Sequence, residues 1–189
     1  PAPFNDPELS RQWHYNNDGS IEGSVAGADI NLFKAWREIG AGRPEVVVAV
    51  IDGGIQYDHP DLAANMWTNE AEMNGTPGVD DDGNGYVDDI YGWNYYTDSG
   101  TITQHFHGTH VAGTVAAVNN NGIGVCGVAG GTGVGDGVRL MSCQNYDTDA
   151  NGQEVGSVTE ESFIYAADNG AVIAQCSWGY NGIETPLSM

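Results

Sequence analysis

Two short segments place an acid and a base where functional groups commonly gather. Asp52 directly follows the apolar run 46–51, and a His-Gly-Thr-His segment begins at His107. In an open parallel sheet, functional groups collect at the carboxyl ends of the strands. An aspartate that accepts one imidazole N–H fixes the tautomer and stabilises the imidazolium, and the second ring nitrogen can then take a proton from a nucleophile. The two residues together therefore predict nucleophilic catalysis.

The stretch around His107 also offers a second chemistry, because it holds three histidines. His105, His107 and His110 supply imidazole nitrogens, which are common zinc ligands. The stretch lacks the His-Glu-x-x-His pattern of zinc hydrolases, and two histidines three positions apart around a glycine favour zinc only weakly. A zinc-dependent hydrolase therefore stays open as a less favoured alternative.

The segment 80–91 carries oxygen ligands at alternate positions and a glycine at the sixth position, as in an EF-hand loop. Its twelfth position is Tyr91 rather than Glu, so Asp88 or Asp89 has to complete the shell of ligands. The pattern predicts calcium binding, and a solvated acidic loop is the alternative. The predicted ligands are Asp80, Asp82, Asn84, Tyr86 and Asp88.

Strand-like runs alternate with helix-like segments along the chain and would position these groups. The run 46–51 is continuous and largely β-branched, which is typical of a strand covered on both faces. Further buried strands are expected at 138–143 and 171–176. We find no internal repeat and no linker that would divide residues 1–189 into two domains. The alternation predicts an α/β fold with a mostly parallel sheet and helices on both faces.

The expected helices are recognised by their ends. Asn31 can cap a helix that Gly40 stops, and a small-residue helix follows the histidine segment. Ser157 and Glu160 form the pattern of a capping box for a third helix. Residues 66–106 are rich in Asn, Asp, Gly and Tyr, and we expect them to form a long structured loop region.

The composition excludes several kinds of partner. The 189 residues include 5 Lys and Arg against 26 Asp and Glu, which gives a formal net charge of −21. Such a surface repels polyanions, so nucleic acids and acidic membranes are poor partners. No apolar run approaches the ~20 residues of a membrane span. The start at Pro1 is typical of a processed chain.

The three cysteines, Cys126, Cys143 and Cys176, have no metal-type spacing. Their odd number leaves at least one of them unpaired. Cys143 and Cys176 fall within strand-like runs, so we expect buried free thiols there.

The segments Val50-Ile51-Asp52-Gly53-Gly54 and 107–113 resemble the Asp and His motifs of the subtilisin-like serine proteases. The overall layout is most similar to the thermitase-like members of that family, and the likeness extends over residues 5–179. The family's chain order is Asp, His, Ser. The resemblance implies that Asp52 is the orienting acid, His107 the general base and His110 a second, non-catalytic histidine.

The resemblance also implies where a substrate binds. Ser177, Trp178 and Gly179 match the family's substrate-binding strand, which pairs with an extended peptide through main-chain hydrogen bonds. Trp178 stands where the family usually has a smaller aliphatic residue. A second peptide-binding edge is expected around residues 152–157.

A further calcium site follows from the same resemblance. Its implied side-chain ligands are Asp6, Asp61 and Asn121, and its implied backbone-carbonyl ligands are Val118, Ile123 and Val125.

The family's nucleophile motif, Gly-Thr-Ser-Met-Ala, does not occur in this sequence, and neither does its oxyanion-hole Asn segment. Ser188-Met189 echoes the nucleophile motif only superficially, because different residues precede it. We therefore expect residues 1–189 to be the N-terminal part of a subtilisin-like peptidase domain, with the fold incomplete in this chain. A complementary C-terminal chain of the same protease, separated by cleavage after Met189, would supply the serine.

The sequence thus predicts a secreted or cell-envelope serine endopeptidase that acts on peptides or proteins and uses calcium as a cofactor. The principal alternative is a non-catalytic, calcium-binding homologue that only binds peptides. A serine in the nucleophile-bearing segment would separate the two.

Overall fold

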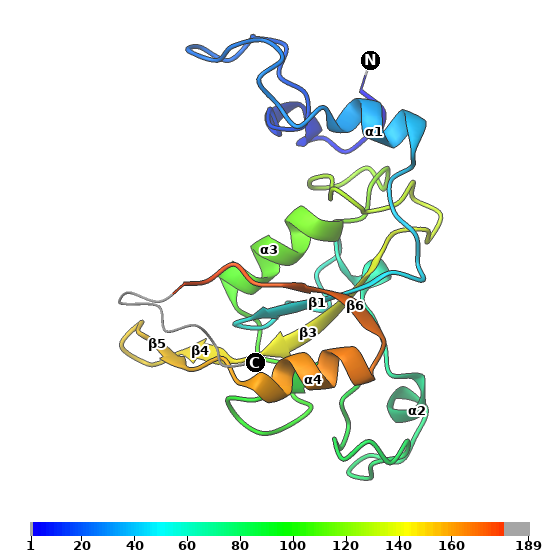
Figure 1. Cartoon of the computed structure of the whole chain (residues 1–189), viewed down its shortest axis with the longest axis vertical. Coiled ribbons are helices and arrows are strands. Elements are labelled where there is room, and N and C mark those ends of the chain that lie inside the picture. Colours follow the sequence, from blue (N-terminus) through cyan, green and yellow to red (C-terminus); the bar gives the residue numbers. More distant parts are fainter. Residues whose placement is uncertain (1, 180–189) are drawn as a thin grey trace.

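A computed structural model describes residues 2–179 of the chain. Its centre is a four-stranded sheet in the order β2-β3-β1-β6, in which every neighbouring pair is parallel (Figure 1). The four strands are β1 (Val47–Asp52), β2 (Gly92–Asn94), β3 (Arg139–Gln144) and β6 (Ala171–Gln175). A separate antiparallel hairpin is formed by β4 (Tyr146–Thr148) and β5 (Glu154–Gly156), and it projects from the body of the molecule.

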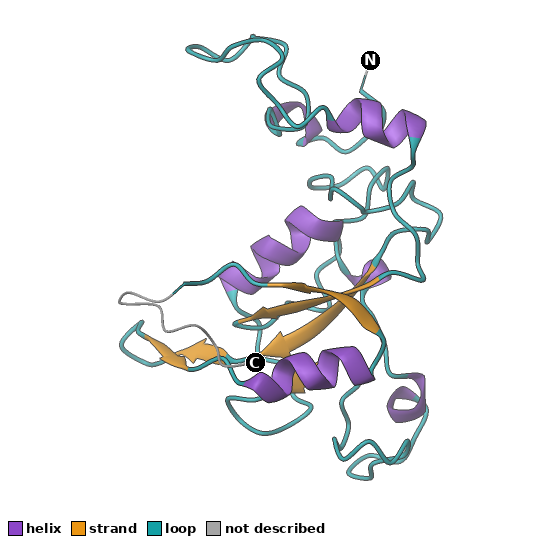
Figure 2. Cartoon of the chain, in the orientation of Figure 1, coloured by secondary structure: helices purple, strands orange, loops and turns teal. Residues whose placement is uncertain are grey.

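Two helices cover opposite faces of the sheet (Figure 2). α3 (Phe106–Ala116) packs on one face, and α4 (Glu160–Asp168) packs on the other. The remaining helical elements are the α-helices α1 (Leu32–Glu38) and α2 (Glu70–Met73) and the 3-10 helices Leu9–Arg11 and Ala63–Asn65. The predicted α/β class, with its parallel sheet between helices, is confirmed.

The burial of β1 on both faces explains its continuous apolar sequence. Successive strand side chains point to opposite faces, so alternate residues of β1 enter two different cores. Val48 and Val50 pack in the core that includes the α3 residues Ala112 and Ala116. Ala49 and Ile51 pack in the core that includes Tyr165 and Ala166 of α4. β1 is thereby fixed between two layers, and its carboxyl end is held in place.

A third cluster of buried residues joins the N-terminal segment to the rest of the chain. It includes Tyr15, Trp36 and Cys126. The indole N–H of Trp36 donates to the carbonyl oxygen of Val128, and the Tyr15 hydroxyl donates to that of Cys126. These contacts connect α1 to the loop that follows α3.

The predicted helices form, but the predicted side-chain caps do not. Asn31 precedes α1 in the left-handed conformation, with φ 55°, and its side chain caps nothing. The N-cap of α4 is Thr159, so Ser157 lies outside the helix and the predicted capping box is wrong. Helix ends depend on the entry angle of the chain, which the tertiary packing sets.

The prediction of a buried strand at 171–176 is wrong in part. β6 pairs with β1 along one edge, but Val172 is 69% and Ile173 is 51% exposed. Cys176 is exposed as well, whereas Cys143 is buried in β3. An apolar run therefore forms a strand here, but its position at the end of the described sheet leaves it uncovered.

The region 66–106, predicted as a loop, also contains regular structure. It includes the short helix α2 and the edge strand β2. β2 pairs with β3, and in this pairing Gly92 lies opposite Ser142. Three residues are too few for a periodic pattern, so β2 left no signal in the sequence. Among the described residues, no helix is long and apolar enough to cross a membrane.

Candidate active site

The carboxylate of Asp52 and the imidazole of His107 lie in direct contact. Nδ1 of His107 is 2.9 Å from Oδ1 and 2.9 Å from Oδ2 of Asp52. A carboxylate only accepts, so Nδ1 carries the proton and donates it, which leaves Nε2 as the nitrogen available to another group. Asp52 is fully buried, whereas the His107 side chain is 36% exposed. The predicted contact between these two residues is confirmed.

The two residues meet because a strand end and a helix start converge. Asp52 is the last residue of β1, and His107 lies in the first turn of α3. Gly108 lets the helix approach, because a Cβ there would clash with the carbonyl oxygen of Gly54 and stand 3.1 Å from Oδ1 of Asp52. The imidazole of His105, the residue before the helix, accepts the backbone N–H of His107 and caps the helix.

Two further groups donate to the Asp52 carboxylate. The hydroxyl of Tyr146 donates to Oδ1 at 2.7 Å, and the backbone N–H of Gly53 donates to the same oxygen at 2.7 Å. Tyr146 was not predicted from the sequence; it begins β4, separated by one residue from the end of β3. In the pairing of β1 with β3, Gln144 lies opposite Asp52, and Tyr146 follows Gln144 by two residues. The sequence signal for Tyr146 was therefore a tyrosine just beyond the end of a predicted strand.

A cleft of about 330 Å³ opens beside His107. Tyr146, Glu154 and Gly156 of the β4–β5 hairpin line one part of it, and the segment 177–179 lines another. The indole N–H of Trp178 donates to the carbonyl oxygen of Ile51 at 2.7 Å and so anchors that segment to β1. His107 therefore lines the same cleft as the β4–β5 hairpin and the segment 177–179.

The sequence profile of the Subtilase family, peptidase family S8, matches residues 43–188. The chain belongs to the subtilase family. Two curated subtilases illustrate the relationship. Subtilisin-like protease 1 of Plasmodium vivax is 45% identical over 147 residues, which are 76% of this chain and 20% of that protein. Neuroendocrine convertase 2 of Bos taurus is 35% identical over 175 residues, which are 93% of this chain and 23% of the relative.

A solved subtilase supports the fold. The crystal structure of the Aeromonas sobria serine protease in complex with its chaperone superimposes with a TM-score of 0.65 and 26% identity. The match covers 97% of this chain and 27% of that structure. The chain thus spans about a fifth to a quarter of the length of these relatives.

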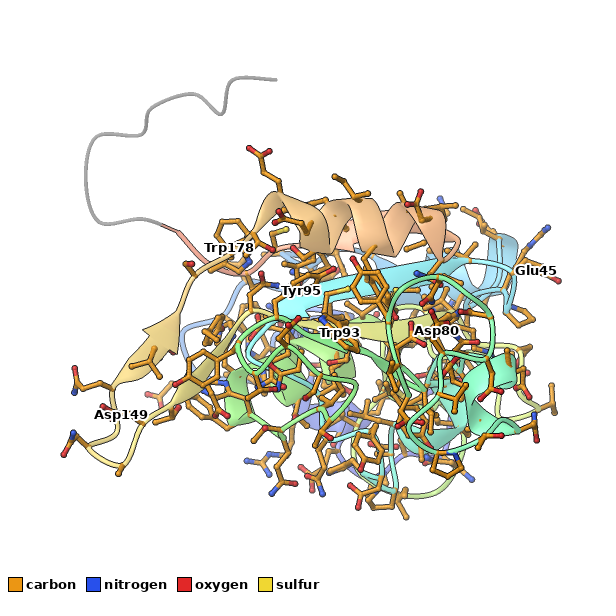
Figure 3. All side chains as sticks on the ribbon, turned by 90° about the horizontal axis from the view of Figure 1, so that it is seen from below. Glu45, Asp80, Trp93, Tyr95, Asp149 and Trp178 are labelled. Carbon is orange, nitrogen blue, oxygen red and sulfur yellow. The ribbon has the colours of Figure 1, made fainter. Side chains whose placement is uncertain are left out.

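The residues predicted for substrate binding begin two positions after the end of β6. Ser177, Trp178 and Gly179 all line the cleft beside His107. Figure 3 shows Trp178 at the same end of the molecule as the hairpin that carries Asp149. The hairpin occupies much of the stretch 152–157, where the second peptide-binding edge was predicted, and its Glu154 and Gly156 line the cleft. Ser188 and the predicted cleavage point after Met189 lie outside the described residues.

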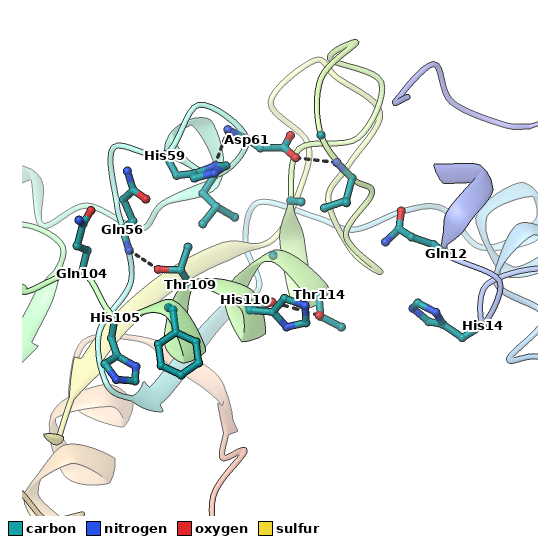
Figure 4. A pocket seen from close by; sticks show the side chains of 16 residues that line it. Gln12, His14, Gln56, His59, Asp61, Gln104, His105, Thr109, His110 and Thr114 are labelled. Atoms are coloured by element: carbon teal, nitrogen blue, oxygen red, sulfur yellow. Dashed lines mark hydrogen bonds between the residues drawn. The ribbon is translucent and has the colours of Figure 1, made fainter. Parts of the chain in front are cut away.

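The three histidines considered as zinc ligands do not form a common site. His107 bonds to Asp52, whereas Nε2 of His105 lies 2.9 Å from the Thr148 hydroxyl. His110 does not line the cleft of His107; with His14, His59 and His105 it lines a second cavity, of about 700 Å³ (Figure 4). In the part of the chain that the structure describes, the only metal-compatible group of acidic, histidine or cysteine side chains contains no histidine.

That metal-compatible group consists of Glu72, Asp80 and Asp82, whose carboxylate oxygens lie within 4.8 Å of one another. Glu72, from α2, was not among the ligands predicted from the sequence. It is 4% exposed, and its carboxylate accepts the backbone N–H groups of Asp81 and Asp88. Hard carboxylate oxygens at this spacing suit Ca²⁺. A cation would relieve the repulsion between the three carboxylates.

The other predicted ligands of this loop lie differently. Both oxygens of Asp88 accept the backbone N–H of Gly78, at 3.1 and 2.9 Å, so this carboxylate does not join the Glu72 group. The Asn84 side chain donates to Asp82 and accepts the backbone N–H of Tyr86 at 2.7 Å. Backbone N–H groups, above all that of Gly85, hold the pKa of the Asp80 carboxyl below its usual value. Asp80 therefore stays ionised and able to bind a cation.

The residues predicted for the other calcium site do come together. The side chain of Asn121 donates to Asp61 at 2.7 Å, and Asp6 accepts the backbone N–H groups of Asn120 and Asn121. Burial raises the pKa of the Asp61 carboxyl, and the Asp6 carboxylate adds to the rise. A bound cation would offset both effects.

The predicted backbone ligands of this site lie in the same loop. The N–H of Val118 donates to the backbone carbonyl of Asp61, and the N–H of Val125 donates to its carboxylate. The N–H of Ile123 donates to the Asn121 side chain. The loop 118–125 thus contacts both Asp61 and Asp6, and the set of two carboxylates and an amide fits a calcium ion.

Proposed function

We propose that this chain is the N-terminal part of a subtilase serine endopeptidase domain and contributes the acid and the base of its catalytic triad. The observation that carries the proposal is the contact between buried Asp52 and partly exposed His107 beside a cleft of about 330 Å³. Membership of the subtilase family supports it. The substrates would be peptides or proteins.

In this proposal Asp52 holds the imidazole with Nδ1–H inward, and Nε2 deprotonates a serine hydroxyl. The serine attacks the carbonyl carbon of the peptide, the C–N bond breaks, and Nε2 returns the proton to the leaving amine. Water then hydrolyses the acyl-enzyme through the same base. The peptide backbone would pair with the segment 177–179, which lines the cleft beside His107.

The serine would come from a C-terminal part of the same protease that this sequence does not contain. Within residues 2–179, β6 is an edge strand of the sheet, and its Val172 and Ile173 are exposed. These features support such a partner, because an unpaired edge strand attracts another strand. Intact-mass analysis of the natural enzyme tests this point. A second stoichiometric species, or a longer chain with a Gly-Thr-Ser motif, is expected, and a lone functional 20.0 kDa species contradicts it.

Calcium would stabilise the loops around this domain. One site would be held by Asp80, Asp82 and the newly found Glu72, and another by Asp6, Asp61 and Asn121. When bound there, the ion would offset the repulsion of these carboxylates. The domain would act outside the cytoplasm, in a secreted or cell-envelope protein, and would bind no nucleic acid because of its charge of −21.

The alternative is a homologue that binds peptides and calcium but catalyses nothing. Hydrolysis of a fluorogenic peptide library by the full-length protein separates the two. His107→Ala is expected to lower kcat by several orders of magnitude. His110→Ala, in the same helix but facing the other cavity, is the control and should keep its activity. Equal rates for wild type and His107→Ala would contradict the enzymatic proposal.

A further inference from the structure

Tyr146 contacts the Asp52 carboxylate from the side of the β4–β5 hairpin. Its hydroxyl lies 2.7 Å from Oδ1 of Asp52 and 3.3 Å from Nδ1 of His107. Since His107 donates through Nδ1, the hydroxyl donates to the carboxylate. Oδ1 thus accepts from Tyr146, Gly53 and His107, whereas Oδ2 has His107 as its only donor among the described residues.

The position of Tyr146 is set by contacts other than Asp52. Its ring packs edge-on against the ring of His105, with centroids 5.4 Å apart. His105 is buried, and its Nε2 lies 2.9 Å from the hydroxyl of Thr148, in the same strand as Tyr146. Tyr146 also pairs with Gly156 across the hairpin, where a Cβ would stand 2.8 Å from Cα of Tyr146. Packing against His105 and pairing with Gly156 therefore hold the Tyr146 hydroxyl next to Asp52.

The hydroxyl also keeps its proton at working pH. Burial raises the pKa of the Tyr146 phenol, and the hydrogen bond to the Asp52 carboxylate raises it further. Because Asp52 is fully buried, its charge depends on protein donors in place of water.

We propose that Tyr146 is a positioning residue of the triad, which fixes the Asp52 carboxylate in the plane that receives the His107 imidazole. The inference rests on the proposed peptidase function. A carboxylate held by one backbone N–H can still rotate about its terminal torsion, which is broad and soft. The Tyr146 hydroxyl removes that freedom from Oδ1. Both oxygens then face Nδ1 at equal distances, and Nε2 points consistently into the cleft.

Tyr146→Phe in the full-length enzyme tests this role, because it removes the oxygen and keeps the ring that lines the cleft. Acylation by a fluorophosphonate probe reports activation of the serine, and peptide hydrolysis gives kcat and KM separately. We expect the acylation rate and kcat to fall about ten-fold, as for the loss of a hydrogen bond to a charged group, with KM within about two-fold of wild type. Tyr15→Phe is the matched control, since it removes a buried hydroxyl that donates only to a backbone carbonyl.

A double-mutant cycle tests whether Tyr146 acts on the acylation rate through the Asp52 carboxylate. If Tyr146 acts through the carboxylate, Tyr146→Phe should add no further loss of acylation rate in an Asp52→Ala background. Full additivity of the two losses overturns the inference, and so does a change confined to KM. An unchanged rate for Tyr146→Phe, beside a reactive wild type, overturns the role of Tyr146 alone. A wild type that does not react with the probe overturns the peptidase proposal, and this inference with it.

Discussion

Gly108 of α3 packs directly against the carbonyl oxygen of Gly54, with no room for a methyl group between the helix and the loop that follows β1. The contact brings the start of the helix next to the Asp52 carboxylate. It therefore determines whether His107, one residue earlier, can reach Asp52.

Gly108→Ala should displace the start of α3. We expect a loss of about 1–3 kcal/mol in the free energy of unfolding, because the added methyl overpacks a buried contact, together with a fall in kcat. Gly113→Ala is the control, since a Cβ there meets nothing within 4 Å and its backbone is helical. This control should be neutral or more stable by up to ~1 kcal/mol. Equal stability changes for the two variants in denaturant titrations would contradict the steric argument.

Asp52→Asn tests how much catalysis depends on the negative charge of the Asp52 carboxylate. The asparagine side chain keeps the volume of Asp52, but it cannot stabilise an imidazolium and it can donate to Nδ1, which favours the wrong tautomer of His107. A loss in kcat on the order of 10⁴-fold is expected, with little change in KM. Steady-state kinetics on a soluble peptide measure this effect. A loss smaller than about ten-fold would show that His107 acts without Asp52.

Removal of calcium should lower the melting temperature of the full-length protein, because an ion that binds only the folded state stabilises it by mass action. At a calcium concentration about 100 times the Kd, the stabilisation is about 2.7 kcal/mol. Calorimetry before and after chelation with EGTA measures the difference. An identical melting curve in the two conditions speaks against both proposed sites.

Glu72→Gln tests whether Glu72 is a calcium ligand at the acidic loop. The variant removes the buried carboxylate that joins Asp80 and Asp82, so calcium affinity at this loop should fall at least about ten-fold. Glu70→Gln, on the same helix but outside the group, is the matched control. Isothermal titration of both variants with calcium gives the comparison. Similar affinities would exclude Glu72 as a ligand.

The tip of the β4–β5 hairpin should respond to acid. The backbone N–H groups of Gln153 and Asn151 donate to Asp149 and hold its pKa below the usual value. A carboxyl whose pKa is lower in the folded state stabilises the fold above its unfolded pKa of about 3.9 and loses this contribution as the pH falls through the folded value.

An NMR titration follows this change directly. The amide signals of residues 151 and 153 should shift together with the Asp149 carboxyl, at a pH below about 3.9. In Asp149→Asn these two signals should no longer follow the pH. A carboxyl that titrates at or above about 3.9 would contradict the hydrogen bonds at the hairpin tip.

The sequence by itself determined the parts of this protein that depend on local runs and motifs. The apolar run of β1, the helix after His105 and the order of Asp52 and His107 were all predicted, because each is encoded within a few neighbouring residues. The contact between Asp52 and His107 was also predicted, from the pair of motifs at a strand end and a helix start.

The tertiary structure decided what depends on contacts between distant segments. Glu72 joins Asp80 and Asp82 only because α2 folds back on the acidic loop, and Tyr146 reaches Asp52 only through the hairpin after β3. Asp88 has the right spacing for a ligand, yet it turns to Gly78. Cys176 follows an apolar run but is exposed. Spacing along the chain fixes which residues can be neighbours on one element, whereas the direction of a side chain and its burial depend on the elements packed against it.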